Sequence, residues 1–347
     1  MNKINWTQID TEMSFRPLIK SGGEILVLRF FGFRPQNDSN AAIYENLCLI
    51  FICVSFLVLS GVSEAASLTP SLTAGVGYDD NIDFLASDVS RDGLFLIRPR
   101  IDFGVNLSGQ DIISGAYSYT FQRFFMGMNG NFTDNFGYAA YEHYFTERIS
   151  IELAGEGEIF NDSVVSLYNY RRTAVLPSIK YLMGKTMMIH SYGFSDIDFP
   201  DRTIQTGGDK QKDKLTEVSM FMLHGISERT TIGGGYSYKK NSSNNDSYDY
   251  TSQNISIGVW HYFSTKAGLN FIYQYQLLNF DNWRVDSSLR KDSYNRIYTE
   301  LSYEIDKSAK ILCQYSYLFN DSNDVNQNFK KNYIFLGLKY TFEKWKI

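Results

Sequence analysis

The sequence predicts an all-β protein, a transmembrane antiparallel up-and-down β-barrel of about 14 strands that follows an N-terminal signal peptide. Three observations lead to this prediction. After residue 66, apolar and polar residues alternate with a period of two, the alternating segments are longer than soluble strands, and their connections are alternately short and long. We therefore expect an N-terminal extension and signal peptide over residues 1–65, and an outer-membrane barrel over residues 66–347.

The composition excludes several classes of protein. Aromatic residues make up 16% of the 347 residues, with 25 Tyr and 26 Phe, which is unusually high for a soluble domain. A formal charge of -5 without a dense run of Lys or Arg argues against nucleic acid as a partner. Cys48 and Cys53 share one apolar run, so Cys313 alone provides neither a disulfide framework nor a cysteine zinc site in the rest of the chain.

That apolar run, LCLIFICVSFLVL from Leu47 to Leu59, has the length of a signal sequence and is too short to span a bilayer comfortably. Small residues follow, and we expect cleavage after Ala65. The 46 residues upstream are long for a signal peptide and include Glu45 beside the apolar run. A single membrane anchor with a cytosolic head therefore stays open as the alternative to a mature protein that starts near Ala66.

The strands themselves show the alternation. Apolar side chains share one face from Leu68 to Tyr78, and again from Phe95 to Leu107, where Arg98 and Arg100 lie on the opposite face. The thirteen residues of the second segment suit a strand that crosses a membrane at a tilt of about 45°. Further strands are expected near 112–123, 135–145, 149–160, 174–183, 187–196, 215–225, 230–240, 251–263, 267–278, 294–305, 309–319 and 332–342.

Six tight turns and seven long loops connect these segments, and both ends of the predicted barrel lie on the side of the tight turns. The long loops are expected at 79–92, 124–134, 161–173, 197–214, 241–250, 279–293 and 320–331. Short periplasmic turns, long extracellular loops and an even strand number are typical of bacterial outer-membrane barrels. An open sheet edge cannot be satisfied in a bilayer, so we expect closure, with a soluble β-sandwich as the alternative.

Histidine recurs at one position of these hairpins, since HYFTER at 143–148 returns as HYFSTK at 261–266. Tyrosine takes the same position in other hairpins, and the phase of the strand points His261 outward. We therefore predict an aromatic girdle at the lipid interfaces, with tyrosines at the outer rim, in preference to a metal site or a catalytic base. The phase of His190 is ambiguous. The predicted girdle consists of His143, His224, His261, Tyr303, Tyr117, Tyr119, Tyr236, Tyr238, Tyr273, Tyr275, Tyr315 and Tyr317.

Charged residues fall on the opposite, polar phase of the strands. At membrane depth such residues need water or internal partners, so they are predicted to line the lumen. Arg98 and Arg100 either face an open lumen and favour anionic groups such as acidic sugars, or pair with carboxylates of other strands such as Glu152 or Glu300. The lumen candidates are Arg98, Arg100, Asp102, Glu152, Glu156, Glu158, Lys180, Lys239, Arg296, Glu300, Glu304, Lys310 and Lys339.

Three segments carry a resemblance to a known family: SLTPSLTAGVGYDDNIDF at 67–84, LFLIRPRIDFGVNL at 94–107 and AYSYTFQRF at 116–124. The chain resembles outer-membrane β-barrel proteins associated with exopolysaccharide-biosynthesis and exosortase loci. That resemblance implies a porin-like protein linked to polysaccharide export, and it brings no catalytic residues with it.

From these observations we expect a bacterial outer-membrane channel for saccharides or small solutes, and no enzyme, metal site or cofactor. The alternative is a plugged structural or adhesive barrel that acts through its extracellular loops. The expected partners are the lipid bilayer with its lipopolysaccharide, polysaccharide, and the outer-membrane assembly machinery. The alternating LGLKYTF at 336–342 resembles the terminal strand signal that this machinery recognises, although Glu343 to Ile347 follow it.

Overall fold

A computed structural model of the chain describes residues 66–82, 84, 90–125, 130–163, 166–204 and 208–346. The predicted signal peptide lies outside the described residues. Fourteen long strands follow one another, with a short fifteenth strand, β15 (Trp345–Lys346), after them. The long strands are β1 (Ala66–Asp79), β2 (Asp92–Asn106), β3 (Asp111–Phe124), β4 (Asn131–Thr146), β5 (Ile149–Asp162), β6 (Tyr170–Met183), β7 (Thr186–Thr203), β8 (Lys210–Ser227), β9 (Thr230–Ser243), β10 (Tyr250–Tyr262), β11 (Ala267–Val285), β12 (Ser288–Glu304), β13 (Ala309–Ser322) and β14 (Phe329–Thr341).

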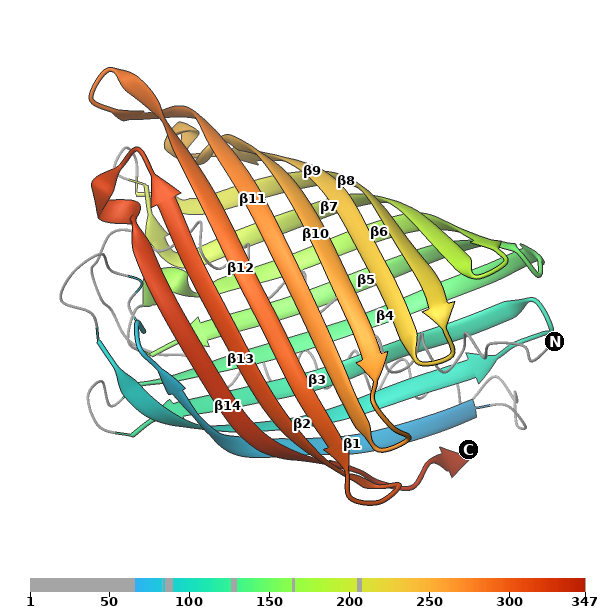
Figure 1. The fold of residues 1–347 in the computed structure, drawn as a ribbon. Coiled ribbons are helices and arrows are strands. Elements are labelled where there is room, and N and C mark those ends of the chain that lie inside the picture. Colours follow the sequence, from blue (N-terminus) through green and yellow to red (C-terminus); the bar gives the residue numbers. More distant parts are fainter. Residues whose placement is uncertain are drawn as a thin grey trace.

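The sheet closes into a barrel. Each long strand pairs antiparallel with the next, and β14 pairs with β1 from Ser71 opposite Thr341 to Asp79 opposite Tyr333. The strands slant steeply across the barrel, with the long loops at one end and the tight turns at the other (Figure 1). The predicted 14-stranded antiparallel barrel is thus confirmed, and the sandwich alternative is wrong, because the closing pairing leaves no second sheet.

The side chains divide into two faces. In β5, Ser150, Glu152 and Ala154 are buried, whereas Ile151 and Leu153 between them are exposed. Across the barrel most large exposed apolar residues occupy this outward phase, as an apolar band facing lipid requires. A closed sheet satisfies its backbone in lipid without water, and together with this band it places the chain in the bacterial outer membrane. Among the described residues, no helix is long and apolar enough to cross a membrane.

The strands extend further at the long-loop end than the alternation predicts. The predicted loop 279–293 is mostly a hairpin, in which β11 and β12 turn at residues 286–287 with Asp286 at φ 53°. The predicted loop 197–214 is likewise strand up to Thr203 and again from Lys210. The prediction of these two loops was wrong because backbone pairing continues above the bilayer, where the outward face is polar, as at Asp198, and the inward face includes apolar residues such as Phe199.

The seam of the barrel includes the C-terminal tail. The Phe342 N–H donates to the Pro70 carbonyl at 2.9 Å, and β15 then pairs with the start of β1, with Trp345 opposite Leu68. The first residues of β1 therefore gain a partner beyond the point where β14 ends. Trp345 and Lys346, which follow the terminal strand signal, are therefore part of the sheet.

Candidate functional site

The barrel interior is the candidate site, and the predicted lumen residues all lie on its face. Each of the thirteen occupies the strand phase that carries the buried side chains, from Arg98 on β2 to Lys339 on β14. Their immediate surroundings differ, because some pair with a neighbouring strand, some pair within their own strand and others bind neutral groups.

One acidic wall consists of β4, β5 and β6. The Lys180 ammonium lies 3.0 Å from Glu152 Oε2 and 3.2 Å from Glu142 Oε2, and all three side chains are at most 14% exposed. The Ser150 hydroxyl donates to Glu142 at 2.6 Å. Glu142 belongs to this group although it was absent from the predicted set. Its two-residue spacing from Ala140 on the buried phase of β4 is the signal that would have found it.

The same wall continues toward the long loops around Arg172. Its guanidinium lies 3.8 Å from Glu156 Oε2 and 3.6 Å from Glu158 Oε2, and it donates to the Ser195 hydroxyl at 3.3 Å. The Tyr170 hydroxyl donates to Glu158 at 2.6 Å. The sequence pattern did not identify Arg172 because it fell in the predicted loop 161–173. Arg172 is eight residues before Lys180, however, so an extended strand places both side chains on the same face.

Further pairs follow around the wall. The Lys239 ammonium lies 3.3 Å from Glu217, and Lys310 lies 3.4 Å from Glu304. Each pair joins adjacent strands of the barrel. Glu217 is a second carboxylate that the predicted set lacked.

Two predicted residues of β12 bind mainly neutral groups. Glu300 accepts hydrogen bonds from Asn270 at 3.1 Å, Gln314 at 2.7 Å and Tyr298 at 3.0 Å. The Arg296 guanidinium lies 5.7 Å from the centroid of the Tyr298 ring. Polar side chains of three neighbouring strands thus satisfy this carboxylate within the wall.

Arg98 and Arg100 of β2 do not form the predicted ion pairs with carboxylates of other strands. Arg100 donates to Asp102 on its own strand, with Nε 2.9 Å from Oδ1, and Arg98 Nε donates to the Thr120 hydroxyl of β3 at 2.9 Å. Pairing of these arginines with Glu152 or Glu300 was wrong. Side chains two residues apart share a face and lie closer than the opposite wall, so Arg100 finds its carboxylate locally.

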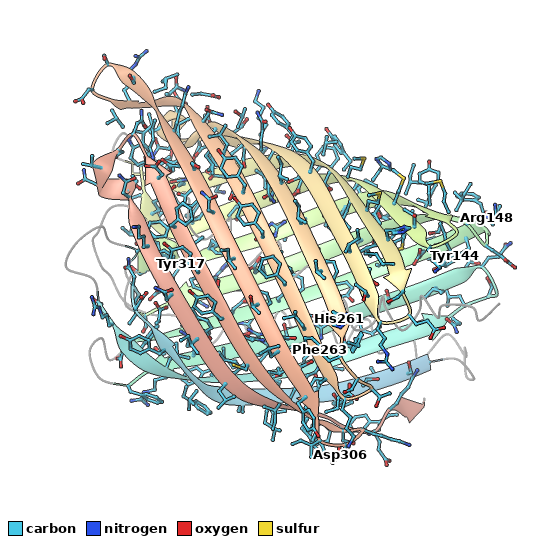
Figure 2. All side chains as sticks on the ribbon, viewed as in Figure 1. Tyr144, Arg148, His261, Phe263, Asp306 and Tyr317 are labelled. Atoms are coloured by element: carbon cyan, nitrogen blue, oxygen red, sulfur yellow. The ribbon has the colours of Figure 1, made fainter. Side chains whose placement is uncertain are left out.

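The predicted girdle residues lie on the outward phase. Nδ1 of His224 lies 2.9 Å from the Thr186 hydroxyl, and Nδ1 of His261 lies 2.9 Å from the Thr230 hydroxyl. The ring of His261 meets that of Phe263 edge to face, with centroids 4.9 Å apart. Figure 2 shows His261 and Phe263 toward the short turns and Tyr317 further toward the long loops.

His143 has the same ring contact with the following phenylalanine, Phe145, at 4.8 Å. Its Nδ1 lies 2.8 Å from Asp111 Oδ1, which also accepts a hydrogen bond from the Tyr141 hydroxyl. His190, which had no assignment, is exposed on the outward phase of β7, where its ring lies 6.2 Å from that of Tyr181. The described residues contain no group of three or more His, Cys, Asp or Glu side chains that could hold a metal ion.

His261→Ala is expected to leave channel conductance unchanged and to reduce folding yield slightly, because the ring contacts Phe263 and Thr230 on the outer face and no interior residue. Conductance in planar bilayers and the folded fraction on a gel measure these effects. His261→Tyr, the side chain found at this position in other hairpins, serves as the control and should restore the yield. A correctly folded His261→Ala protein with lost conductance would contradict the girdle prediction.

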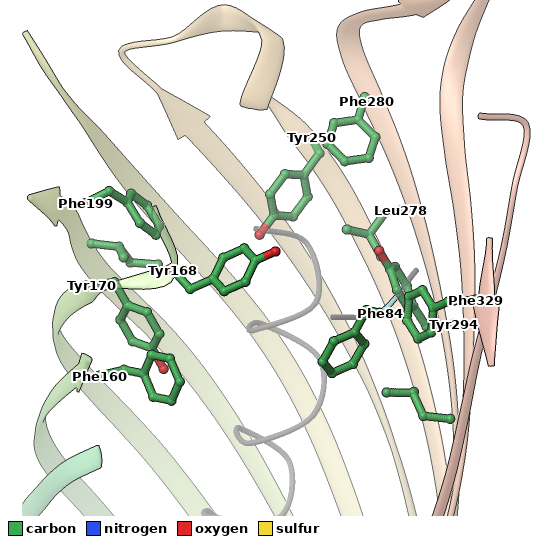
Figure 3. Packing of buried hydrophobic residues seen from close by; sticks show 12 residues of the cluster. Phe84, Phe160, Tyr168, Tyr170, Phe199, Tyr250, Leu278, Phe280, Tyr294 and Phe329 are labelled. Carbon is green, nitrogen blue, oxygen red and sulfur yellow. The ribbon is translucent and has the colours of Figure 1, made fainter. Parts of the chain in front are cut away.

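At the long-loop end, the interior contains a large apolar and aromatic cluster. Twelve buried residues from β5–β7, β10–β14, the turn η2 (Ser166–Tyr168) and the β1–β2 loop form one cluster, here called the mouth cluster. Figure 3 shows its rings directed into the barrel from both groups of strands, with Tyr168 and Phe84 between them. The mouth cluster consists of Phe84, Phe160, Tyr168, Tyr170, Ile197, Phe199, Tyr250, Leu278, Phe280, Tyr294, Leu318 and Phe329.

Phe84 joins this cluster from the β1–β2 loop. Its backbone has φ 55°, and its ring meets Phe329 edge to face with centroids 5.0 Å apart. The Lys331 ammonium lies 3.8 Å from the ring centroid and 2.7 Å from Asp79 Oδ2. Ile82 of the same loop belongs to a second buried cluster with residues of β2, β3 and β14. The loop therefore directs apolar side chains into the barrel.

A fully buried arginine supports the mouth cluster on β12. The Arg290 guanidinium lies 4.5 Å from the Phe280 ring centroid and 4.3 Å from that of Trp283. It also donates to Asp292 at 3.0 Å and to Gln327 at 2.9 Å. Aromatic faces and charge-assisted hydrogen bonds together compensate its burial. Sequence reasoning missed it because it fell in the predicted loop 279–293.

Arg202 of β7 is held in a similar way on another part of the rim. Its guanidinium lies 4.4 Å from the Phe199 ring centroid and 5.1 Å from that of Tyr248, and it donates to the Leu167 carbonyl at 2.9 Å. Tyr248 belongs to the turn η3 (Asp246–Tyr248) in the β9–β10 loop. Burial raises the pKa of its hydroxyl, and the nearby Arg202 opposes that rise. The hydroxyl therefore stays neutral at physiological pH.

Comparison with known proteins bears on the fold. No family model matches the sequence, and no curated protein matches it. Among solved structures, the outer-membrane channel DcaP of Acinetobacter baumannii is 12% identical with a TM-score of 0.51, covering 81% of this chain and 98% of that one. The anion-selective porin from Comamonas acidovorans is 9% identical with a TM-score of 0.46, over 81% and 100% of the two chains. At these identities the likeness concerns the barrel fold alone.

Proposed function

We propose that the protein is an outer-membrane channel for small hydrophilic solutes, with saccharides as the favoured class. The observation that carries the proposal is the placement of charge in the interior. The ion pairs described above join residues of one strand, of adjacent strands or, for Glu142 and Lys180, of strands two apart. Charges that pair along the wall leave the centre of the barrel unbridged, whereas charges paired across a barrel would close it.

Saccharides fit the mixture of groups on the interior face. Trp260 and Tyr298 are inward-facing aromatic residues of one buried cluster, and the Tyr298 hydroxyl donates to Glu300, which also accepts from two amides. Aromatic faces stack on the apolar faces of sugar rings, and carboxylates and amides accept or donate hydrogen bonds to hydroxyl groups. A link to exopolysaccharide export is supported by the sequence resemblance alone.

Arg98→Glu tests the channel. Arg98 is exposed in the interior and donates only to Thr120 among the described side chains, so reversal changes the charge seen by a passing ion without breaking an ion pair. The reversal potential in a salt gradient is expected to shift toward cation selectivity. Arg123→Glu, on the outward phase of β3, is the matched control and should leave it unchanged. Swelling of liposomes in saccharide solutions tests passage of the proposed solutes directly.

The mouth cluster favours a second candidate, a barrel closed at its extracellular end that acts through its loops. Its apolar residues come from two groups of strands, and Phe84 and Tyr168 lie between these groups. A folded protein that neither conducts ions nor admits saccharides would support this candidate and refute the channel. Measurable conductance that responds to Arg98→Glu would refute the closed barrel.

A further inference from the structure

A group of basic residues lies on the outer surface of β6, β8 and β9, above the apolar band. All are exposed and occupy the outward phase of their strands, so they face the surrounding membrane and not the interior. We call this group the basic patch, and it is distinct from the candidate site. It consists of Arg171, Lys210, Lys212, Lys214 and Lys240.

The register gives the height of the patch. On β9 the outward residues Tyr236 and Tyr238 belong to the predicted outer girdle, and Tyr238 lies opposite Val218, which is 51% exposed on β8. Lys240 follows Tyr238 by two residues and Lys214 precedes Val218 by four. At ~3.3 Å per residue and a tilt of about 45°, these lysines lie roughly 5 and 9 Å beyond the edge of the apolar band.

Basic residues outnumber acidic residues on this part of the outer surface. The patch contains five basic residues, and the outward acidic residues between its strands are Asp196 and Asp198 of β7. Asp198 lies opposite Arg171 on one side and Lys212 on the other, with its carboxylate 3.8 Å from the Lys212 ammonium. Asp201 and the exposed Asp209 also lie at this strand end, so the five basic residues exceed the nearby carboxylates by one positive charge.

At the corresponding height elsewhere, the outward residues are mostly neutral or acidic. On β10 and β11 they are Thr251, Gln253, Asn279 and Asp281, and single exposed basic residues occupy the outward phase of β3, β12 and β14, namely Arg123, Lys291 and Lys330. Basic residues are thus clustered on β6, β8 and β9 but occur singly on these other strands, which argues for a ligand at the cluster rather than for general solubility.

The backbone beneath the patch is fixed by its neighbours. Asn244 of the β9–β10 loop accepts from the Lys212 N–H at 2.8 Å and donates to the Lys210 carbonyl at 2.9 Å. The Lys210 ammonium donates to the Thr203 hydroxyl at 2.9 Å. The lysines therefore project from an ordered strand end, and less ordering is needed when a ligand binds.

We propose that the basic patch binds the phosphorylated head group of lipopolysaccharide in the outer leaflet. The phosphates of this glycolipid lie directly above its acyl chains, at the height of Lys214 and Lys240, and its acidic core sugars extend toward Lys212 and Lys210. The apolar side chains below, such as Val218 and Met220, would contact the acyl chains. Ammonium and guanidinium groups recognise phosphate by charge-assisted hydrogen bonds.

The test compares two variants of equal charge change in the folded, purified barrel. The patch variant carries Arg171→Gln, Lys212→Gln, Lys214→Gln and Lys240→Gln. The rim variant carries Lys185→Gln, Arg229→Gln, Lys266→Gln and Lys307→Gln, which are exposed at the short turns. Native mass spectrometry measures retained lipopolysaccharide after detergent exchange, with dephosphorylated lipopolysaccharide and phosphatidylethanolamine as comparison ligands.

The wild type and the rim variant are expected to retain lipopolysaccharide, and the patch variant to lose it by about tenfold or more. Raising the salt to 1 M should reproduce the loss in the wild type, because screening weakens exposed charges. Equal retention by both variants, or equal binding of the dephosphorylated ligand, would overturn the proposal. So would a change of oligomeric state in the patch variant alone, since a second copy of the chain would then be the partner.

Discussion

Lys180→Met is expected to lower the free energy of unfolding by about 3–5 kcal/mol, because one ammonium serves two buried carboxylates. It lies 3.0 Å from Glu152 and 3.2 Å from Glu142, whose side chains are 7% and 11% exposed. Methionine keeps the length of the side chain but leaves two negative charges near each other in a poorly hydrated part of the wall. Urea unfolding in lipid vesicles, followed by the mobility of the folded band on a gel, measures the loss.

Two controls separate the ion pairs from general effects of this substitution. Lys185→Met, at an exposed turn, should change stability by less than about 0.5 kcal/mol. Adding Glu142→Gln and Glu152→Gln to Lys180→Met should recover most of the lost stability, because the uncompensated charges are then gone. If Lys180→Met alone is as stable as the wild type, the acidic wall is hydrated well enough to dispense with the ammonium.

Phe84→Ala is expected to raise single-channel conductance severalfold, since the substitution removes the ring that the β1–β2 loop places in the mouth cluster. The ring contacts Phe329 and the Lys331 ammonium, and the rest of this cluster is carried by the barrel wall and the η2 turn. Loss of the ring leaves space within the mouth cluster, and the liposomes should then admit larger saccharides in the swelling assay. Planar-bilayer recording and swelling rates measure both effects.

Phe263→Ala is the matched control, because Phe263 is 55% exposed on the opposite end of the barrel. It should leave conductance unchanged. Conductance that is the same in Phe84→Ala as in the wild type would show that this ring does not limit the path. A silent wild type with a conducting Phe84→Ala protein would instead identify the mouth cluster as the closure of the barrel.

The sequence alone was sufficient for the architecture within the membrane. Lipid on one side and a polar interior on the other impose a strict period of two, and closure follows because open edges cannot be satisfied in a bilayer. For that reason the pattern assigned Arg98 of β2 and Glu300 of β12 to the polar phase, which in the structure is the phase of the buried side chains. The short turns were equally apparent, because they interrupt the alternation at the membrane edge.

The contacts between side chains of different strands could be seen only in the tertiary structure. The stagger of the strands decides which neighbouring side chains lie at the same height, and the pattern of a single strand does not contain this information. It determines the partners of Arg100 and Lys180, and it brings Arg172 and Arg290 into the interior. The mouth cluster likewise required the fold, because above the bilayer the outward face is polar and apolar residues such as Ile197 and Phe199 point inward, which inverts the pattern used within the membrane. The inner and outer faces can therefore be predicted from the sequence because lipid selects apolar residues on one face. Contacts between strands cannot, because they depend on the closed geometry of the barrel.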